Sequence, residues 1–242
     1  LLLAGIPYNV PGETINRLCA SGMSSVIHAH RAIKANDGDL FISGGVENMT
    51  RGPLVISKAS KAFGRDSKMF DSSFGWRFIN PLLDKLYGTD SMGTTAENLV
   101  SKYNISREDQ DKFAYNSQMK ASLSQKNGVF EQEIVKVVIP QRKKEDIIFD
   151  KDEFIKPNTS VEILSKLRAA FKKDGSVTAG NSSGLNDGAA AMLLSSEKGL
   201  KKFNLKPKAK IISSAVVGVE PKIMGIGPVY ASIKALNKAK LN

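Results

Sequence analysis

The stretch "CASGMSSVIHAHRAIKANDGDLFISGG", residues 19–45, decides the fold because it contains the helix and the strand of one α/β unit. Four apolar residues and one histidine recur there at helical spacing, at Met23, Val26, Ile27, His30 and Ile33. This spacing predicts a helix directly after Cys19. Asn36 and Gly38 are typical of a helix end, and residues 39–45 form a short apolar run that ends in paired glycines, as a buried strand does. The predicted fold class is therefore α/β.

The composition is that of an ordinary soluble globular protein, with 41% hydrophobic and 24% charged residues in a chain of 242. One cysteine excludes an internal disulfide framework and an all-cysteine metal site, and two histidines argue against a histidine-based one, so we expect no metal. A single cysteine also fits a reducing cytoplasm. The apolar opening "LLLAGIPYNV" is short and lacks a basic leader, and no apolar run approaches the ~18 residues that span a bilayer. We expect a cytoplasmic protein with no membrane partner.

The net charge of +11 has three explanations that the sequence leaves open. The first is a solvated basic surface, the second is attraction to a multiply phosphorylated small ligand, and the third is nucleic acid. No basic stripe interleaved with aromatic residues occurs, so we expect no nucleic-acid partner.

Beyond the first unit, the pattern becomes irregular from about residue 49 to 180 and then regular again. A loop region of this length inside a compact protein is normally functional. We expect a helix over 96–104 capped by Thr94 or Thr95, and a second helix that begins at Ser106 and ends at Gly128. Further helices are predicted over 160–175 and 224–239, and strands over 133–140, 189–196 and 208–220.

Cys19 is the candidate catalytic residue. It lies among small residues at the start of the predicted helix, where amide N–H groups and the helix dipole stabilise a thiolate. The alternative is an inert, small core residue. His28 and His30 lie about 13 to 17 Å further along the same helix, so neither can act as its base.

Four long motifs in order resemble the thiolases, the acetyl-CoA C-acyltransferases. They are "NRLCASGMSSVIHAHRAIKANDGDLFISGGVENMTRGP", "MGTTAENLVSKYNISREDQDKFAYNSQMKA", "KLRAAFKKDGSVTAGNSSGLNDGAAAMLLSS" and "VVGVEPKIMGIGPV". The resemblance implies the thiolase fold, with α-β-α-β-α layers, two related halves and an inserted loop domain. It divides the chain into part of the N-terminal core half (1–48), an inserted coenzyme A (CoA)-binding loop domain (49–185), a return to that half (186–206) and the start of the C-terminal half (207–242).

The resemblance also implies an activity and its residues. Cys19 would carry the acyl group as a thioester between a 3-ketoacyl-CoA and CoA, or in the reverse condensation. CoA and its thioesters would be substrates, and no cofactor is expected. Positions that match the family's CoA contacts are Leu83, Met92, Lys156, Phe171, Ala179 and Ser183. Core packing remains an alternative for Phe171, which would lie one helical turn from Leu167, and a solvated surface remains one for Lys156.

Departures from the family pattern qualify this picture. The family's first strand-helix unit and its later "NEAFA", "GHP" and second-cysteine segments have no match, so we expect a piece of a longer protein that is inactive alone. Residues 70–81, "FDSSFGWRFINP", resemble the degradative, 3-oxoadipyl-like branch. The resemblance further implies a homodimer or homotetramer, and fatty acid metabolism as its setting.

Two other functions stay open on the same fold. One is a decarboxylating ketoacyl synthase, and the other is a non-catalytic CoA- or lipid-binding protein. The sequence leaves the direction of the reaction and the acyl chain length undecided.

Overall fold

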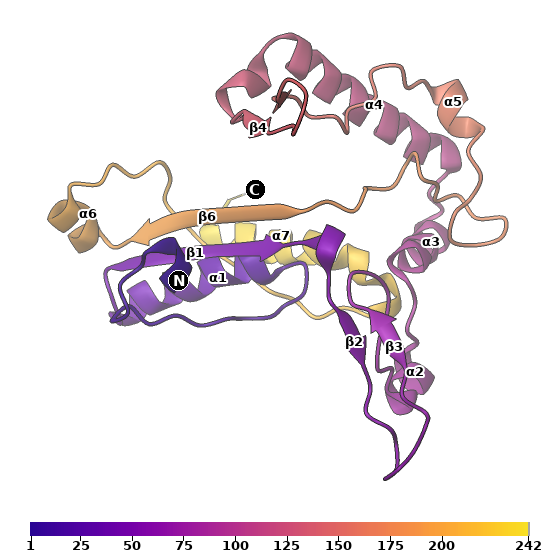
Figure 1. The fold of residues 1–242 in the computed structure, drawn as a ribbon, viewed down its shortest axis with the longest axis horizontal. Helices are drawn as coiled ribbons and strands as arrows, with labels where there is room; N and C mark the ends of the chain where they lie inside the picture. The colour runs from indigo at the N-terminus through magenta and orange to yellow at the C-terminus, as the bar shows by residue number, and fades with distance from the viewer. Residues whose placement is uncertain (242) are drawn as a thin grey trace. The chain divides into compact units, whose positions relative to one another are not determined.

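The computed structural model describes residues 1–241, and the chain divides into two compact units. The first unit consists of Leu1–Arg77, Leu185–Gly218 and the chain from Pro228 on, and the second of Phe78–Gly184 and Val219–Gly227. Both units contain helices and strands (Figure 1). No helix within residues 1–241 has the length and apolar character needed to cross a membrane.

The first unit is built around a helix and two long strands. Its elements are the short 3-10 turns η1 (Leu2–Ala4) and η2 (Met49–Arg51), the helices α1 (Ser21–Ala35), α6 (Glu197–Phe203) and α7 (Gly227–Ala239, all but its first residue), and the strands β1 (Leu40–Glu47), β2 (Leu54–Ile56), β3 (Met69–Asp71) and β6 (Gly188–Ser195). Strands β2 and β3 form a separate antiparallel hairpin.

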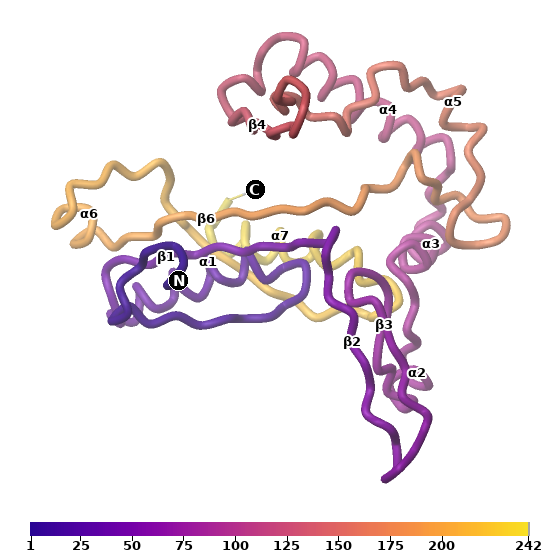
Figure 2. The backbone as a smooth tube through the Cα atoms, viewed as in Figure 1, coloured from indigo at the N-terminus to yellow at the C-terminus, as the bar shows by residue number. Residues whose placement is uncertain are grey.

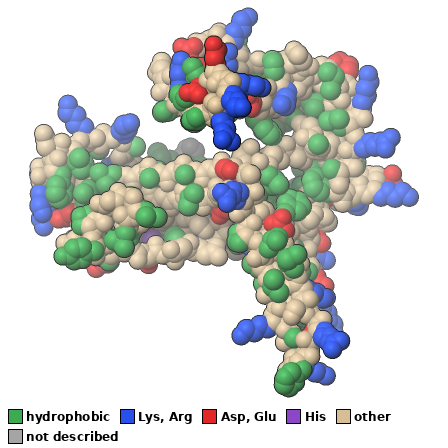
Figure 3. All heavy atoms as spheres, viewed as in Figure 1, with side chains coloured by type: hydrophobic (Ala, Val, Ile, Leu, Met, Phe, Trp, Pro, Cys, Tyr) green, Lys and Arg blue, Asp and Glu red, His purple; other side chains and the backbone are tan. Residues whose placement is uncertain are grey.

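The second unit is mainly helical. Its elements are α2 (Pro81–Tyr87), α3 (Met92–Tyr103), α4 (Arg107–Lys126), η3 (Val129–Gln132), the antiparallel hairpin β4 (Val137–Ile139) and β5 (Ile147–Phe149), α5 (Val161–Ser165) and η4 (Pro221–Ile226). Hydrophobic side chains remain visible at the surface of both units (Figure 3).

Antiparallel pairing of β1 with β6 joins segments that lie far apart in the sequence. The register runs from Leu40 opposite Ser195 to Glu47 opposite Gly188, so the chain leaves and re-enters at one end of the ladder (Figure 2). Gly44 permits this pairing because a Cβ there would collide with the carbonyl oxygen of Ala190. The predicted strands at 39–45 and 189–196 are thus confirmed as strands, but most of their residues are exposed in the described chain and not buried as expected.

Helix α1 packs closely on β1 through small residues. The hydroxyl of Ser43 donates to the carbonyl of Ser25 at 3.2 Å, and the Cα of Gly22 lies against Gly45. The predicted helix is confirmed, but it buries Ser24, Ile27 and Ala29, while Met23 is 72% exposed. The packed face therefore differs from the apolar stripe because the glycine-bearing strand accepts small side chains.

Three sequence predictions are wrong. Helix α5 ends at Ser165 instead of continuing to residue 175, because the Arg107 guanidinium takes the carbonyls of Leu164 and Leu167 at 2.6 and 3.0 Å. Helix α3 is capped by Ser91, whose hydroxyl accepts from the Thr94 amide, and by neither predicted threonine. Residues 208–220 form no strand in the described chain; the Ser213 hydroxyl instead donates to Ala235 of α7.

The helix with Ser106 as N-cap is confirmed, since its hydroxyl accepts from the Asp109 amide. Strand β4 falls inside the predicted 133–140, and α7 inside 224–239.

Aspartates fasten both ends of the β1–β6 ladder. At one end the Thr50 amide donates to Asp187 at 2.9 Å, and at the other the Ser196 hydroxyl donates to Asp39 at 2.6 Å. These hydrogen bonds hold the pKa of each carboxyl below its ordinary value, with Lys198 adding to the effect at Asp39. Hydrogen bonds to an ionised carboxylate stabilise the ionised form.

We predict that Asp39→Asn and Asp187→Asn each lower stability at pH 7 and lower it by less near pH 3. A depressed folded-state pKa gives stability that is present above about pH 4 and is lost as pH falls through the folded value. Denaturant unfolding at both pH values measures this. Asp37→Asn, outside the ladder, serves as the control, and an equal loss at both pH values would contradict the assignment.

Candidate functional site

Cys19 is an exposed free thiol in a tight turn just before α1. The Ala20 amide donates to the Arg17 carbonyl at 3.1 Å and the Ser21 amide to the Leu18 carbonyl at 2.9 Å. Leu18 has φ of 48°, a left-handed conformation that leucine rarely adopts. Since its side chain is exposed, Cys19 is not a core residue of the described structure.

Two polar side chains hold this turn. Asn16 accepts a hydrogen bond from the Leu18 amide at 2.8 Å. The Ser21 hydroxyl accepts from the Arg17 amide at 2.8 Å and donates to the Leu18 carbonyl at 2.7 Å. Side-chain bonds of this kind stabilise non-helical backbone before a helix. The turn thus places the exposed thiol of Cys19 directly before Ala20, the N-cap residue of α1.

The two histidines lie within α1, as the sequence predicts. His28 is partly exposed, and its Nδ1 lies 3.8 Å from a Glu13 carboxylate oxygen. His30 is half-buried. Among residues 1–241 no hydrogen bond joins either ring to Cys19, so the geometry assigns neither as its base.

The six positions matched to CoA contacts all belong to the second unit, whereas Cys19 belongs to the first. Each is exposed, which leaves it free to contact a ligand. Leu83 lies on α2, Met92 begins α3, and the others lie in irregular chain, at Lys156, Phe171, Ala179 and Ser183.

Close contacts at two glycines bring together segments of the chain that carry several of these positions. A Cβ at Gly93 would collide with the Phe171 ring, so the ring lies against the start of α3 beside Met92. Phe171 is also not helical, which removes the predicted one-turn relation to Leu167. The Ala170 amide instead donates to the Val177 carbonyl at 2.9 Å, so this segment runs beside the chain that leads to Ala179.

A second contact places the segment of Lys156 near Ser183. A Cβ at Gly184 would meet the ring of Phe154, two residues before Lys156. The Lys156 amide donates to Gln118 at 2.8 Å, while its ammonium group donates to the Glu153 carbonyl at 3.4 Å. None of these contacts brings Leu83 to the group.

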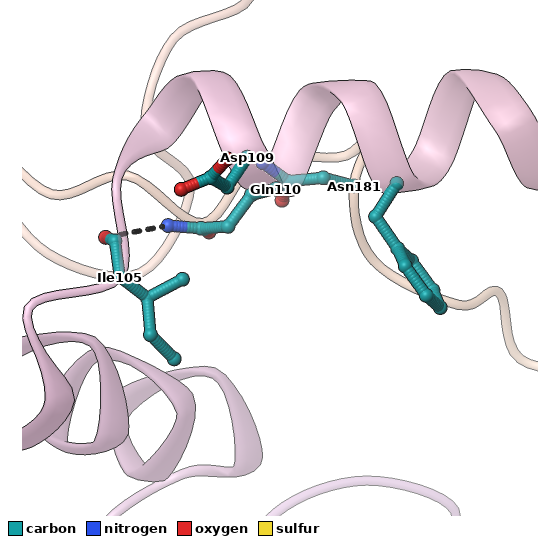
Figure 4. Close-up of a pocket in the computed structure, with 5 residues that line it drawn as sticks. Ile105, Asp109, Gln110 and Asn181 are labelled. Atoms are coloured by element: carbon teal, nitrogen blue, oxygen red, sulfur yellow. Dashed lines mark hydrogen bonds between the residues drawn. The ribbon is translucent and has the colours of Figure 1, made fainter.

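A hollow of the second unit lies elsewhere. It encloses about 340 Å³ and is lined by Ile105, Asp109, Gln110, Phe113 and Asn181, with Gln110 donating to the Ile105 carbonyl (Figure 4). None of the predicted CoA positions lines it. Among residues 1–241, no group of three or more His, Cys, Asp or Glu side chains is arranged to hold a metal ion.

Sequence reasoning missed two buried carboxylates of this unit, Glu97 and Asp111. Both lie in polar helical stretches that resemble solvent-exposed helix faces. On α3 every second residue from Gly93 to Glu97 is buried, with Thr95 between them. The small size of Gly93 and Thr95 is the only signal in the sequence that Glu97 is buried as well.

Comparisons with known proteins agree on one family. A family model described as the thiolase N-terminal domain matches residues 1–198. Over 240 residues the chain is 51% identical to a β-ketoadipyl-CoA thiolase of Acinetobacter baylyi, covering 99% of this chain and 60% of that protein. It is 49% identical to an Escherichia coli 3-oxoadipyl-CoA/3-oxo-5,6-dehydrosuberyl-CoA thiolase, covering 100% of the chain and 60% of the relative.

Solved structures give the same result. The crystal structure of human mitochondrial 3-ketoacyl-CoA thiolase has a TM-score of 0.85 at 39% identity, and that of the Bacillus anthracis acetyl-CoA acetyltransferase has 0.84 at 39%. All of this chain and 60% of each of those chains are covered. The chain therefore spans about 60% of the length of the relatives it matches. By its sequence match and its α/β fold, this chain belongs to the thiolase family.

Proposed function

We propose that the protein transfers acyl groups to and from CoA through a thioester on Cys19. In the cleavage direction the Cys19 thiolate attacks the 3-carbonyl carbon of a 3-ketoacyl-CoA, the bond between C2 and C3 breaks, and the acetyl-CoA carbanion takes up a proton. The thiolate of free CoA then attacks the thioester and releases the shortened acyl-CoA. A thiolate both attacks and leaves well, which suits two successive transfers.

The observation that carries this proposal is the exposed Cys19 in its hydrogen-bonded turn, within a chain of the thiolase family. The segments that carry the predicted CoA positions approach one another at two places, Gly93 against Phe171 and Gly184 against Phe154, which supports a CoA surface on the second unit. There Lys156 would pair with a phosphate, Phe171 would pack on adenine or pantetheine, and Ser183 would hydrogen-bond a pantetheine amide.

We predict that acetyl-CoA acetylates Cys19 in the full-length gene product. Mass spectrometry of the tryptic digest should find one acetyl group on the peptide that contains Cys19. Cys19→Ser should lower turnover at least about 10³-fold with an unchanged unfolding midpoint, because it removes the nucleophile and conserves volume. Ser25→Ala, on α1, is the matched control. An unmodified Cys19 peptide from active protein would refute the proposal.

A non-catalytic CoA- or lipid-binding protein is the alternative. Iodoacetamide labelling of Cys19 that acetyl-CoA blocks, together with turnover, favours the enzyme. CoA binding without acetylation favours the carrier.

We further propose 3-oxoadipyl-CoA as the substrate. Relatives at about 50% identity are β-ketoadipyl-CoA thiolases, and a chain of net charge +11 favours a substrate whose acyl group ends in a free carboxylate. A relative in Staphylococcus aureus at 48% identity bears the name probable acetyl-CoA acyltransferase. An acyl-CoA without the terminal carboxylate is therefore the competing substrate.

We predict a kcat/KM for 3-oxoadipyl-CoA at least about tenfold above that for 3-oxohexanoyl-CoA, which has the same chain length without the carboxylate. Tenfold corresponds to ~1.4 kcal/mol, the scale of one charge-assisted hydrogen bond. The advantage should shrink in 0.5 M salt if charge causes it. Equal values for the two substrates would instead favour fatty acid metabolism.

A homodimer or homotetramer is also proposed. One edge of β1 pairs with β6, and its other edge carries no partner strand in the described chain, which is a surface that proteins normally cover. We predict that light scattering on the full-length product gives a dimer or tetramer at micromolar concentration. A monomer would contradict this.

A further inference from the structure

Glu97 of α3 is a buried carboxylate whose partners all lie in one irregular segment. Only 3% of the residue is exposed. One carboxylate oxygen accepts from the backbone amides of Ser176 and Val177, each at 2.8 Å, and the other lies 3.4 Å from the Ser176 hydroxyl. Burying a charged group is costly unless it is hydrogen-bonded, so these bonds fix the segment to α3.

Asp111 of α4 forms a second anchor for the same segment. The residue is 1% exposed and accepts from the Arg107 guanidinium at 2.7 Å. Asn181 donates to Asp111 at 3.1 Å and to the Ser176 carbonyl at 3.0 Å, and it accepts from the Thr178 amide at 2.7 Å. Two helices therefore hold residues 176–181 from the buried side.

The open side of this anchored segment carries positions assigned to CoA. Ala179 lies within it and Ser183 follows two residues after Asn181, and both are exposed. Phe171 joins through the Ala170–Val177 hydrogen bond and packs on Gly93, one turn before Glu97 on α3. The buried bonds and the proposed ligand contacts thus share one short stretch of backbone.

We propose that Glu97 and Asp111 are positioning residues that hold residues 176–183 in the shape that binds CoA. Both are buried, so they act through the backbone and not by touching the ligand. Holding a loop in its bound conformation lowers the entropy lost on binding and so raises affinity. This inference rests on the proposed function, because it takes the bound molecule to be CoA.

The alternative is a purely structural role, in which losing an anchor lowers stability but not affinity. Glu97→Gln keeps a carbonyl oxygen where both amides need one, whereas Glu97→Leu leaves two buried amides without an acceptor. Asn181→Ser weakens the second anchor from a half-buried position and is the milder variant if Glu97→Leu does not fold. Ile223→Ala removes buried volume from η4 in the same unit and leaves both anchors intact.

The test is calorimetric titration of CoA into the full-length gene product and its variants, with thermal unfolding measured in parallel. We expect Glu97→Leu and Asn181→Ser to raise the Kd for CoA about tenfold or more, and Glu97→Gln to stay within about threefold of wild type. Ile223→Ala should lower the unfolding midpoint without changing the Kd.

Each contrary result has a distinct meaning. If wild type binds CoA and Asn181→Ser and any folded Glu97→Leu bind as tightly, the positioning role is wrong and the proposed function stands. If Ile223→Ala weakens binding as much as they do, affinity follows stability and the positioning role is again wrong. If wild type does not bind CoA at all, the proposed function fails and this inference fails with it.

Discussion

The antiparallel pairing of β1 with β6 is the constraint on which the rest of the fold depends. It brings residues 40–47 against 188–195, and the two aspartates at its ends fasten the turns that enter and leave it. Because β1 ends and β6 begins at the same end of the ladder, residues 78–184 of the intervening chain can belong to a separate unit. The same ladder gives α1 the flat, glycine-bearing surface on which it packs, and so places the turn of Cys19.

The second unit is held together differently. Its most deeply buried groups include two carboxylates and a threonine, and their partners include backbone amides and an asparagine of residues 176–181. Hydrophobic contact is non-directional, whereas hydrogen bonds donated to a buried carboxylate require particular atoms in particular places. A segment without helix or strand can therefore have one defined shape, which is what a surface for a specific ligand needs.

Hydrogen bonds from polar side chains also define the backbone of the turn at Cys19. The side chains of Asn16 and Ser21 form hydrogen bonds that stabilise the left-handed backbone conformation of Leu18. The thiol of Cys19 stays exposed just before α1. Backbone held in a rarely populated conformation is common at active sites, where surrounding bonds over-determine it. The strain adjoins the residue to which we assign the chemistry.

The sequence by itself determined the local elements and the family: the helix before residue 36, the strands with their glycines, the Ser106 cap and the thiolase motifs. These follow from periodicity, capping and turn chemistry, which act over a few residues. Only the tertiary structure decided where helix α5 ends, because Arg107 is far from Leu164 in sequence, and which face of α1 is buried, because the partner strand selects small side chains. It also decided that Glu97 lies inside, since a carboxylate is buried only where distant amides meet it.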